Sequence, residues 1–528
     1  MKKLIVTATL AIGYIACCGI AWSADWLTDG GDATRSGWVK DEKVFTKDNV
    51  KGLKLLWKAQ TKNQFHALHS LMDPLVVSDV PTNDGKKEVV LVVGTDDNVY
   101  AYDSSNGKQV WMKHFSYENQ GQGRGGGPAP KTLAEFASMG FLGPGGSTDV
   151  PAIGPADANG HRTMYVTDGG GNLHSLDISN GEDVKAPFTF GTSKFSLQLQ
   201  GTRVVAAAGG RGIISTDIND PEHKVSASVG FGRSGGLWGR RGPAIDADGV
   251  VWTTTGDGNV DTTDPNNLMV ANSMVGFKLQ SDGSYHIDNY FTPSNWAWLW
   301  HRDLDPNNTP TIFTWKGKEY LVASGKECRL YLLDPKNIGG ADHHTPLFRT
   351  PLFCNEEVDF QDAGSWGALS SWEDPSGTRW VLAPFWGPAH SQFKFPTVNQ
   401  PATKDGGVAA FKLVDVNGKP ELQAVWVSRD MHRGEPPVIA NGVVFSYGSG
   451  EETRQAWPDE GLHMTSEVRA AKSGHATLFA LDGQTGKELW SSGDQITSFN
   501  HFSGVTAING KVYLGTYDGM LYCFGISK

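Results

Sequence analysis

Residues Val89–Trp111 read VVLVVGTDDNVYAYDSSNGKQVW and carry the pattern that decides the fold class. A β-branched run ends in a turn, a short strand with alternating apolar residues follows, and an Asp, a glycine turn and a Trp close the unit. The period of two in VYAYD is typical of a strand with one buried face. Asn106-Gly107 supplies the positive φ that a tight hairpin turn needs. The stretch therefore predicts a small antiparallel sheet.

The same unit recurs along the whole chain. Clear copies occupy Met164–Phe190, Tyr320–Asp334, Ala476–Trp490 and Val512–Gly525, and weaker copies occupy Arg203–Val229, Val250–Tyr290 and Trp380–Trp426. One such sheet cannot bury both of its faces alone, but neighbouring sheets stacked around an axis can. We count about eight units, and repeats of this kind predict an all-β fold, an eight-bladed β-propeller.

The two ends of the chain complement each other. The unit after Val512 lacks its outermost aromatic strand, whereas Leu53–Ala59 (LKLLWKA) forms such a strand with no unit before it. We expect Leu53–Ala59 to complete the last blade, which closes the ring and removes free sheet edges. The insertions Tyr117–Ser147 and Glu451–Ser473 are expected to be loops on one face.

The composition agrees with this fold and excludes some functions. Glycine contributes 65 of 528 residues and tryptophan 18, as expected for many turns and many large flat side chains. The net charge is −11, which argues against a nucleic-acid-binding protein, because such a protein needs a basic face. No Cys-x-x-Cys-His motif for covalent haem is present, so the electrons of any redox reaction must leave through a separate carrier.

The N-terminus predicts an exported bacterial protein, periplasmic or secreted. Residues 1–24 have the features of a signal peptide: two lysines, then the apolar run Leu4–Ile20, then small residues around Ser23. The alternative is a lipoprotein acylated at Cys17 or Cys18, which the residues before them favour less. We expect residues 25–528 to form a single propeller domain without a transmembrane segment.

Three cysteines remain after the signal peptide. Cys328 and Cys354 could form a disulfide in an oxidising compartment. The equally open alternative is that Cys328, Cys354 and Cys523 are three buried thiols with no disulfide between them.

The repeated phrase Asp-x-x-x-Gly-Lys-x-x-Trp resembles the tryptophan-docking repeat of the pyrroloquinoline quinone (PQQ) propellers. That superfamily contains periplasmic alcohol dehydrogenases, polyvinyl-alcohol-dehydrogenase-like proteins and non-catalytic propellers. The resemblance covers nearly all of the mature chain, and three central stretches make it more specific. These are Gly235–Trp238 with Pro243–Asp246 and Thr255–Asp257, then Asp303-Leu304-Asp305 with Thr309-Pro310, then Lys326.

The resemblance implies a role for each of these stretches. Trp238 matches the tryptophan on which the quinone rests, and Lys326 matches the lysine that contacts the quinone. Asp303 matches the catalytic aspartate that takes the substrate hydroxyl proton while hydride passes to the quinone, and Asp305 is the second candidate for this base.

Further groups are expected to hold the quinone and a Ca²⁺ ion. Arg233, Arg240 or Arg241 could add positive charge for the quinone carboxylates. Asp257 and Asn259 offer oxygen ligands of the kind that Ca²⁺ prefers. Thr262 and Leu268 stand where an EF-hand loop needs Gly and Glu, so these residues do not form an EF-hand.

Each of these residues also has a plainer structural interpretation. Trp238 could pack blades like other tryptophans, Asp303 and Asp305 could be turn residues, and Lys326 could be a surface lysine. Residues 257–261 could be only a polar hairpin loop.

Together the motifs predict an exported PQQ-dependent dehydrogenase that oxidises a small hydroxylated substrate. Its cofactors would be PQQ and Ca²⁺, and its electron acceptor a separate protein such as a cytochrome c. The alternative is a non-catalytic PQQ-like propeller that serves as a binding or assembly scaffold in the cell envelope.

Overall fold

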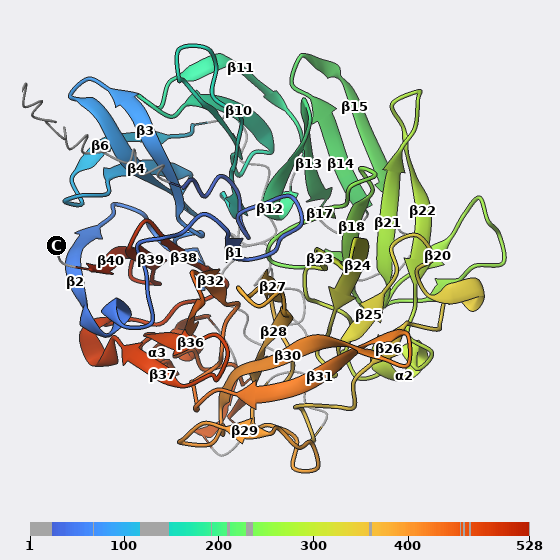
Figure 1. Cartoon of the computed structure of the whole chain (residues 1–528). Helices are drawn as coiled ribbons and strands as arrows, with labels where there is room; N and C mark the ends of the chain where they lie inside the picture. Colours follow the sequence, from blue (N-terminus) through green and yellow to red (C-terminus); the bar gives the residue numbers. More distant parts are fainter. Residues whose placement is uncertain are drawn as a thin grey trace, which may run out of the picture.

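The computed structural model describes residues 24–66, 68–116, 147–191, 193–208, 212–228, 236–357, 362–454, 456–457, 460–463 and 466–526. The expected signal peptide except for Ala24, the insertion at residues 117–146, Arg233 and Gly235 lie outside these residues. The described chain is all-β, and its sheets are arranged around an axis as the eight blades of a propeller (Figure 1). The predicted fold class is confirmed.

The first four blades follow one another along the chain, each a mainly antiparallel sheet. Blade 1 is β3 (Leu75–Thr82), β4 (Gly85–Gly94), β5 (Asn98–Asp103) and β6 (Gln109–His114); blade 2 is β8 (Ala152–Ile153), β9 (Thr163–Thr167), β10 (Asn172–Asp177) and β11 (Asp183–Thr189). Blade 3 is β7 (Asp149–Val150), β12 (Ser193–Gln200), β13 (Arg203–Ala208), β14 (Gly212–Asp217) and β15 (Asp220–Ser228). Blade 4 is β16 (Leu237–Trp238), β17 (Ala244–Ile245), β18 (Val251–Thr255), β21 (Met274–Leu279) and β22 (Tyr285–Phe291).

The last four blades complete the circle. Blade 5 is β23 (Thr311–Trp315), β24 (Lys318–Ala323), β25 (Tyr331–Leu333) and β26 (Phe348–Arg349); blade 6 is β27 (Ser370–Glu373), β28 (Arg379–Trp386), β30 (Gly406–Val416), β31 (Lys419–Val427) and β29 (Thr397–Val398). Blade 7 is β1 (Trp38–Val39), β32 (Val438–Ala440), β33 (Val443–Gly448), β36 (Thr477–Asp482) and β37 (Glu488–Ser491). Blade 8 is β38 (Val505–Ile508), β39 (Lys511–Gly515), β40 (Met520–Ile526) and β2 (Leu53–Gln60).

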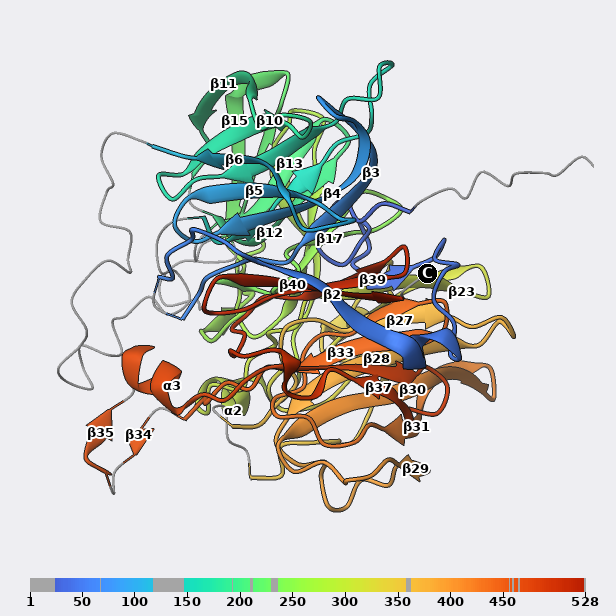
Figure 2. The same cartoon turned by 90° about the vertical axis from the view of Figure 1, so that its left-hand side faces the viewer.

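Short elements lie between or beside the blades. They are the hairpins β19 (Val260–Asp261) with β20 (Met269–Val270) and β34 (Ala456–Trp457) with β35 (Leu462–His463), the helices α2 (Trp296–Trp300) and α3 (Ser466–Lys472), and the 3-10 turns Asn49–Gly52, Gly340–Asp342 and Gly493–Gln495. The insertion at residues 451–473 is therefore more than a loop, since it contains α3 and the β34–β35 hairpin. Figure 2 shows this insertion and α2 on the same face of the propeller. Within the described residues, no helix has the length and apolar character needed to span a bilayer.

The ring closes as predicted. β2 pairs antiparallel with β40, in a register that runs from Leu53 opposite Ile526 to Gln60 opposite Met520. Because β2 is the outermost strand of blade 8, that blade combines strands from both ends of the chain. The pairing gives β40 a neighbour on each side and leaves it no free edge.

Tryptophan docking joins neighbouring blades. The indole N–H of Trp57 donates to the Ser104 carbonyl of the next blade at 2.9 Å, and that of Trp111 donates to the Ile178 carbonyl at 2.8 Å. Gly107 lies in the turn beneath Trp57 with φ +70°, and a Cβ added there would come within 2.6 Å of the indole ring. The glycine of the repeated phrase is therefore needed both for the turn and for the tryptophan that packs on it.

The N-terminal segment, residues 24–39, crosses the hub and bonds to all eight blades. From the first residue on, these hydrogen bonds join Ala24 to Asn509, Trp26 to Val76, Leu27 to Ile153, Thr28 to Leu197, Ala33 to Ile245, Thr34 to Ile312, Ser36 to Ser371 and Gly37 to Ile439. The partners occur in the order of the blades around the ring, beginning with blade 8. The segment thereby ties the innermost parts of the blades together.

Arg35 anchors this segment. Its side chain is fully buried and donates to the carbonyls of Pro243, Leu197 and Asp29 at 3.0, 3.0 and 2.5 Å, and to the Thr28 hydroxyl at 2.7 Å. Burial lowers the pKa of Arg35 to about 10. One guanidinium therefore connects the N-terminal segment to blades 3 and 4.

Arg35→Met should destabilise the whole ring. The substitution keeps an unbranched apolar stem but leaves buried carbonyls without donors, which should lower the free energy of unfolding by about 3 kcal/mol or more. Thermal unfolding followed by circular dichroism measures the loss. Arg349→Met, at an exposed position of β26, is the matched control and should melt like the wild type. Equal melting temperatures for the two variants would show that Arg35 does not anchor the segment.

Candidate functional site

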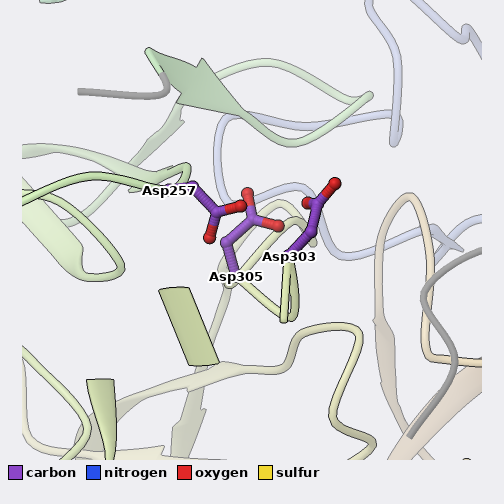
Figure 3. A group of neighbouring side chains, drawn as sticks. All are labelled: Asp257, Asp303 and Asp305. Atoms are coloured by element: carbon purple, nitrogen blue, oxygen red, sulfur yellow. The ribbon is translucent and has the colours of Figure 1, made fainter. Parts of the chain in front are cut away.

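Three aspartates meet at one end of the propeller (Figure 3). Asp257 follows β18, and Asp303 and Asp305 follow helix α2 and precede β23. One carboxylate oxygen from each of the three lies within 4.8 Å of the others. The residues come from adjacent blades, 4 and 5, so the ring brings together carboxylates that are more than 40 residues apart in the chain.

The ammonium group of Lys326, which follows β24, neutralises part of the negative charge of the three aspartates. It lies 2.6 Å from Asp305 Oδ1 and forms a second ion pair with Asp303. The side chains of Lys326 and Asp305 are only 4% and 2% exposed, whereas that of Asp303 is 46% exposed. The cluster therefore has a buried half and an accessible half, and Asp303 is its accessible carboxylate.

The electrostatics of the cluster follow from this crowding. Burial, together with the carboxylates of Asp305 and Asp303, raises the pKa of Asp257 to about 9. Burial also raises the pKa of Asp305 to about 6, although the Lys326 ammonium opposes the shift. Burial alone would lower the pKa of Lys326, but the carboxylates of Asp305 and Asp303 raise it. In the absence of a metal ion, Asp257 and Asp305 therefore hold their protons more tightly than ordinary carboxylates do.

The arrangement fits a hard metal ion. Three carboxylates and one ammonium leave two negative charges uncompensated when all groups are ionised. Asp257 Oδ1 is buried and has no hydrogen-bond partner among the described residues, so it is available as a ligand. Oxygen ligands close together are what Ca²⁺ and similar ions require. Asn259 is exposed, and its backbone carbonyl accepts a hydrogen bond from Ala271.

Two tryptophans flank the cluster. The Lys326 ammonium lies 5.7 Å from the ring centre of Trp238 and 5.2 Å from that of Trp366. The Phe195 ring packs against the Trp238 ring, with 5.9 Å between the ring centres. Trp366 in turn stacks on Trp386 at 4.8 Å. A flat aromatic surface therefore lies beside the acidic cluster, as a planar quinone requires.

The axis itself is filled by a separate buried charge network. Arg240 pairs with Glu435 at 2.6 Å, and Arg241 donates to the carbonyls of Leu369 and Pro437 at 2.9 and 3.0 Å. The cavity that these arginines line has a volume of about 30 Å³, room for about two water molecules. A space of this volume is too small for a tricyclic quinone.

A disulfide between Cys328 and Cys354 fixes the loop that carries Lys326. Asn355, the residue after Cys354, donates its amide to the Lys326 carbonyl at 2.6 Å. The pairing resolves the two alternatives that the sequence left open, and Cys523 is buried and free. The lysine is therefore held from both its backbone and its side chain.

The structure brings together most of the residues expected from the sequence. Asp257, Asp303, Asp305 and Lys326 form one cluster, and Trp238 lies beside it. The expected roles of Arg240 and Arg241 at the quinone find no support, because both guanidiniums are engaged at the axis. Sequence reasoning missed Trp366 as a neighbour of Lys326; its Gly-Ser-Trp-Gly context is the only local signal.

The pH dependence of stability tests the cluster. A carboxyl whose pKa is raised on folding binds a proton that the unfolded chain releases above about pH 4. Its contribution to stability is thus full at low pH and is lost as pH rises toward 9. Asp257→Asn removes this loss and should make the metal-free protein more stable than the wild type at pH 9, but not at pH 4. Because solvent screens this partly exposed group, we expect about 1 to 3 kcal/mol.

Chemical denaturation at pH 4, 6 and 9 in the presence of a chelator measures the difference. Asp261→Asn is the matched control, because Asp261 is exposed and lies in β19, four residues after Asp257. The interpretation is wrong if the free energy of unfolding of Asp257→Asn differs from that of the wild type by the same amount at all three pH values.

Comparisons with known proteins identify the fold. The chain matches no protein-family model and no curated protein sequence. A europium-containing methanol dehydrogenase has a similar structure, with a TM-score of 0.57 and 13% identity over 95% of this chain and 98% of that one. Two quinohemoprotein alcohol dehydrogenases, from Comamonas testosteroni and Pseudomonas putida HK5, have TM-scores of 0.53 and 0.52 and identities of 14% and 13%, over 95% of this chain and 80% of theirs. The chain thus shares the eight-bladed propeller fold of the PQQ-dependent alcohol dehydrogenases.

Proposed function

We propose that the protein is an exported PQQ-dependent dehydrogenase that oxidises an alcohol or another hydroxyl compound. The observation that supports this function is the meeting of Asp257, Asp303, Asp305 and Lys326 beside Trp238. Neither buried aspartates nor a buried lysine is needed to hold a propeller together, and such groups are costly to bury. Perturbed pKa values in one cluster are typical of a site with a chemical role.

Asp303 is the base in this proposal. Its side chain is 46% exposed, so a substrate hydroxyl can reach it from solvent. Asp303 takes the hydroxyl proton, and the hydrogen on the carbinol carbon leaves as hydride, which yields a carbonyl product. Lys326 holds the carboxylates of Asp303 and Asp305 in a fixed position through its two ion pairs.

Asp257 and Asp305 are the proposed metal ligands, with Asn259 as a further source of oxygen. Both carboxylates are partly or fully buried and face each other across the cluster. Ca²⁺ suits such oxygen ligands. Three carboxylates also suit a trivalent ion, and one protein of similar fold is a europium-containing enzyme.

Trp238 is the proposed support for the quinone, with Lys326 as the cation that contacts it. When bound, PQQ supplies the hydride acceptor. The electrons then pass to a separate acceptor such as a cytochrome c, because the chain has no motif for covalent haem. The expected signal peptide places this reaction in the periplasm or outside the cell.

The filled axis favours a second candidate function. The arginines at the hub and the small cavity between them are consistent with a non-catalytic scaffold that has lost the cofactor. Binding of the cofactor separates the two candidates. A dehydrogenase must bind PQQ in the presence of a metal ion, whereas a scaffold must not.

Reconstitution tests the proposed function. The purified chain is mixed with PQQ and either Ca²⁺ or Eu³⁺, quinone binding is followed by absorbance, and dye reduction is assayed with a panel of simple alcohols. Asp303→Asn should lower kcat by roughly 100-fold or more, because general-base catalysis contributes at least that much, and should leave quinone binding intact. Trp238→Ala should weaken quinone binding instead.

Asp342→Asn, an exposed carboxylate on another loop of blade 5, is the matched control and should keep full turnover. Absence of quinone binding at tens of micromolar with either metal would leave only the scaffold. Full turnover by Asp303→Asn would assign the base to another residue.

A further inference from the structure

A cavity of about 280 Å³ lies directly beside the acidic cluster. Its polar lining comes from Asn295, Glu327, Arg329 and Asn355, and its apolar lining includes Trp298 and Leu304. The volume is near the lower end of the range typical of small-molecule sites. Its lining thus combines planar polar groups with an indole.

Residues next to the proposed catalytic groups in the chain line the cavity. Leu304, which is 1% exposed, is the residue between Asp303 and Asp305. Glu327 directly follows Lys326. The cavity and the acidic cluster are therefore built from the same two chain segments.

The polar groups of the cavity have hydrogen-bonding capacity left. The Glu327 carboxylate is buried and accepts from Asn295 Nδ2 at 3.2 Å and from the Tyr331 hydroxyl. A carboxylate has about four acceptor positions, so it can accept further hydroxyl donors. Arg329 bonds through Nη1 to the Thr350 carbonyl at 2.9 Å and contacts Glu327 through Nε, which leaves Nη2 without a partner among the described residues.

Asn295 lines the cavity with its side-chain amide. It occupies the N-cap position of α2, where an Asn side chain ordinarily accepts a backbone N–H, but it makes no such bond. Its Nδ2 donates to the Glu327 carboxylate at 3.2 Å, whereas its Oδ1 is buried and presents no surface to a ligand in the cavity. Asn295 therefore orients Glu327 toward the ligand.

Trp298 supplies an apolar surface. Its side chain lies on the exposed side of α2 and is 42% exposed, with the Arg302 guanidinium 5.3 Å from its ring centre. An exposed indole beside carboxylate, amide and guanidinium groups suits a molecule with an apolar C–H face and a rim of hydroxyls.

We propose that this cavity is a subsite for polyhydroxylated substrates of the size of a monosaccharide or sugar alcohol. The C–H face of the substrate packs on Trp298, its hydroxyls bond to Glu327 and Arg329, and one further hydroxyl reaches Asp303. Turnover of such a substrate rests on the proposed dehydrogenase function, whereas its binding does not.

Binding is tested first, on the cofactor-free protein. Saturation-transfer NMR with sorbitol, glucose and ethanol as probes should show saturable binding of sorbitol or glucose, and little of ethanol. Trp298→Ala and the isosteric Glu327→Gln should each weaken polyol binding tenfold or more. Trp315→Ala, at a half-exposed tryptophan of β23, is the matched control and should bind like the wild type. Absence of polyol binding by the wild type, or an equal loss in Trp315→Ala, would overturn the proposal.

Turnover is tested second, on the protein reconstituted with PQQ and metal. The ratio of kcat/KM for sorbitol to that for ethanol should fall at least tenfold in Trp298→Ala and Glu327→Gln, and stay constant in Trp315→Ala. Polyol binding without oxidation of any alcohol would support the subsite and refute the dehydrogenase. Ethanol oxidation without polyol binding would do the reverse.

Discussion

The hydrogen bonds between residues 24–39 and the innermost parts of all eight blades are the interaction on which the rest of the structure depends. A propeller blade packs only against its neighbours, so its position relative to the axis is set by whatever occupies the hub. Here the occupant is backbone, anchored by the buried Arg35. Because backbone groups inside a protein must be paired, this segment and the blades stabilise each other.

The segment also decides where a site can form. It crosses the hub near Ile245, which pairs with Val251 at the start of β18, whereas Asp257 follows the other end of that strand. Arg240 and Arg241 line a small cavity at the axis. Asp303 follows α2 in the chain, so the acidic cluster lies on the face of the propeller that carries α2 (Figure 2).

The repeated phrase was sufficient to predict the blades and the closing strand, because its glycine and tryptophan act locally or between neighbours. The Asp-x-Asp segment and Lys326 were also found from sequence. The N-terminal segment was not, since its bonds use backbone groups that leave no side-chain period. The use of Arg240 and Arg241 at the axis depended on Glu435 and on carbonyls far along the chain, which no local motif reports. The same holds for Trp366, which meets Lys326 only in the folded ring.

The pairing of β2 with β40 has a consequence for biosynthesis. A ribosome releases Leu53–Gln60 before the other seven blades and Met520–Ile526 after them, so blade 8 cannot assemble until those seven blades have emerged. Until then β40 has not been synthesised, and β2 has no strand to pair with. Apolar segments of the blades that have already formed remain exposed and can self-associate. Closure of the ring is thereby a late step in folding, unlike in a chain built from independent domains.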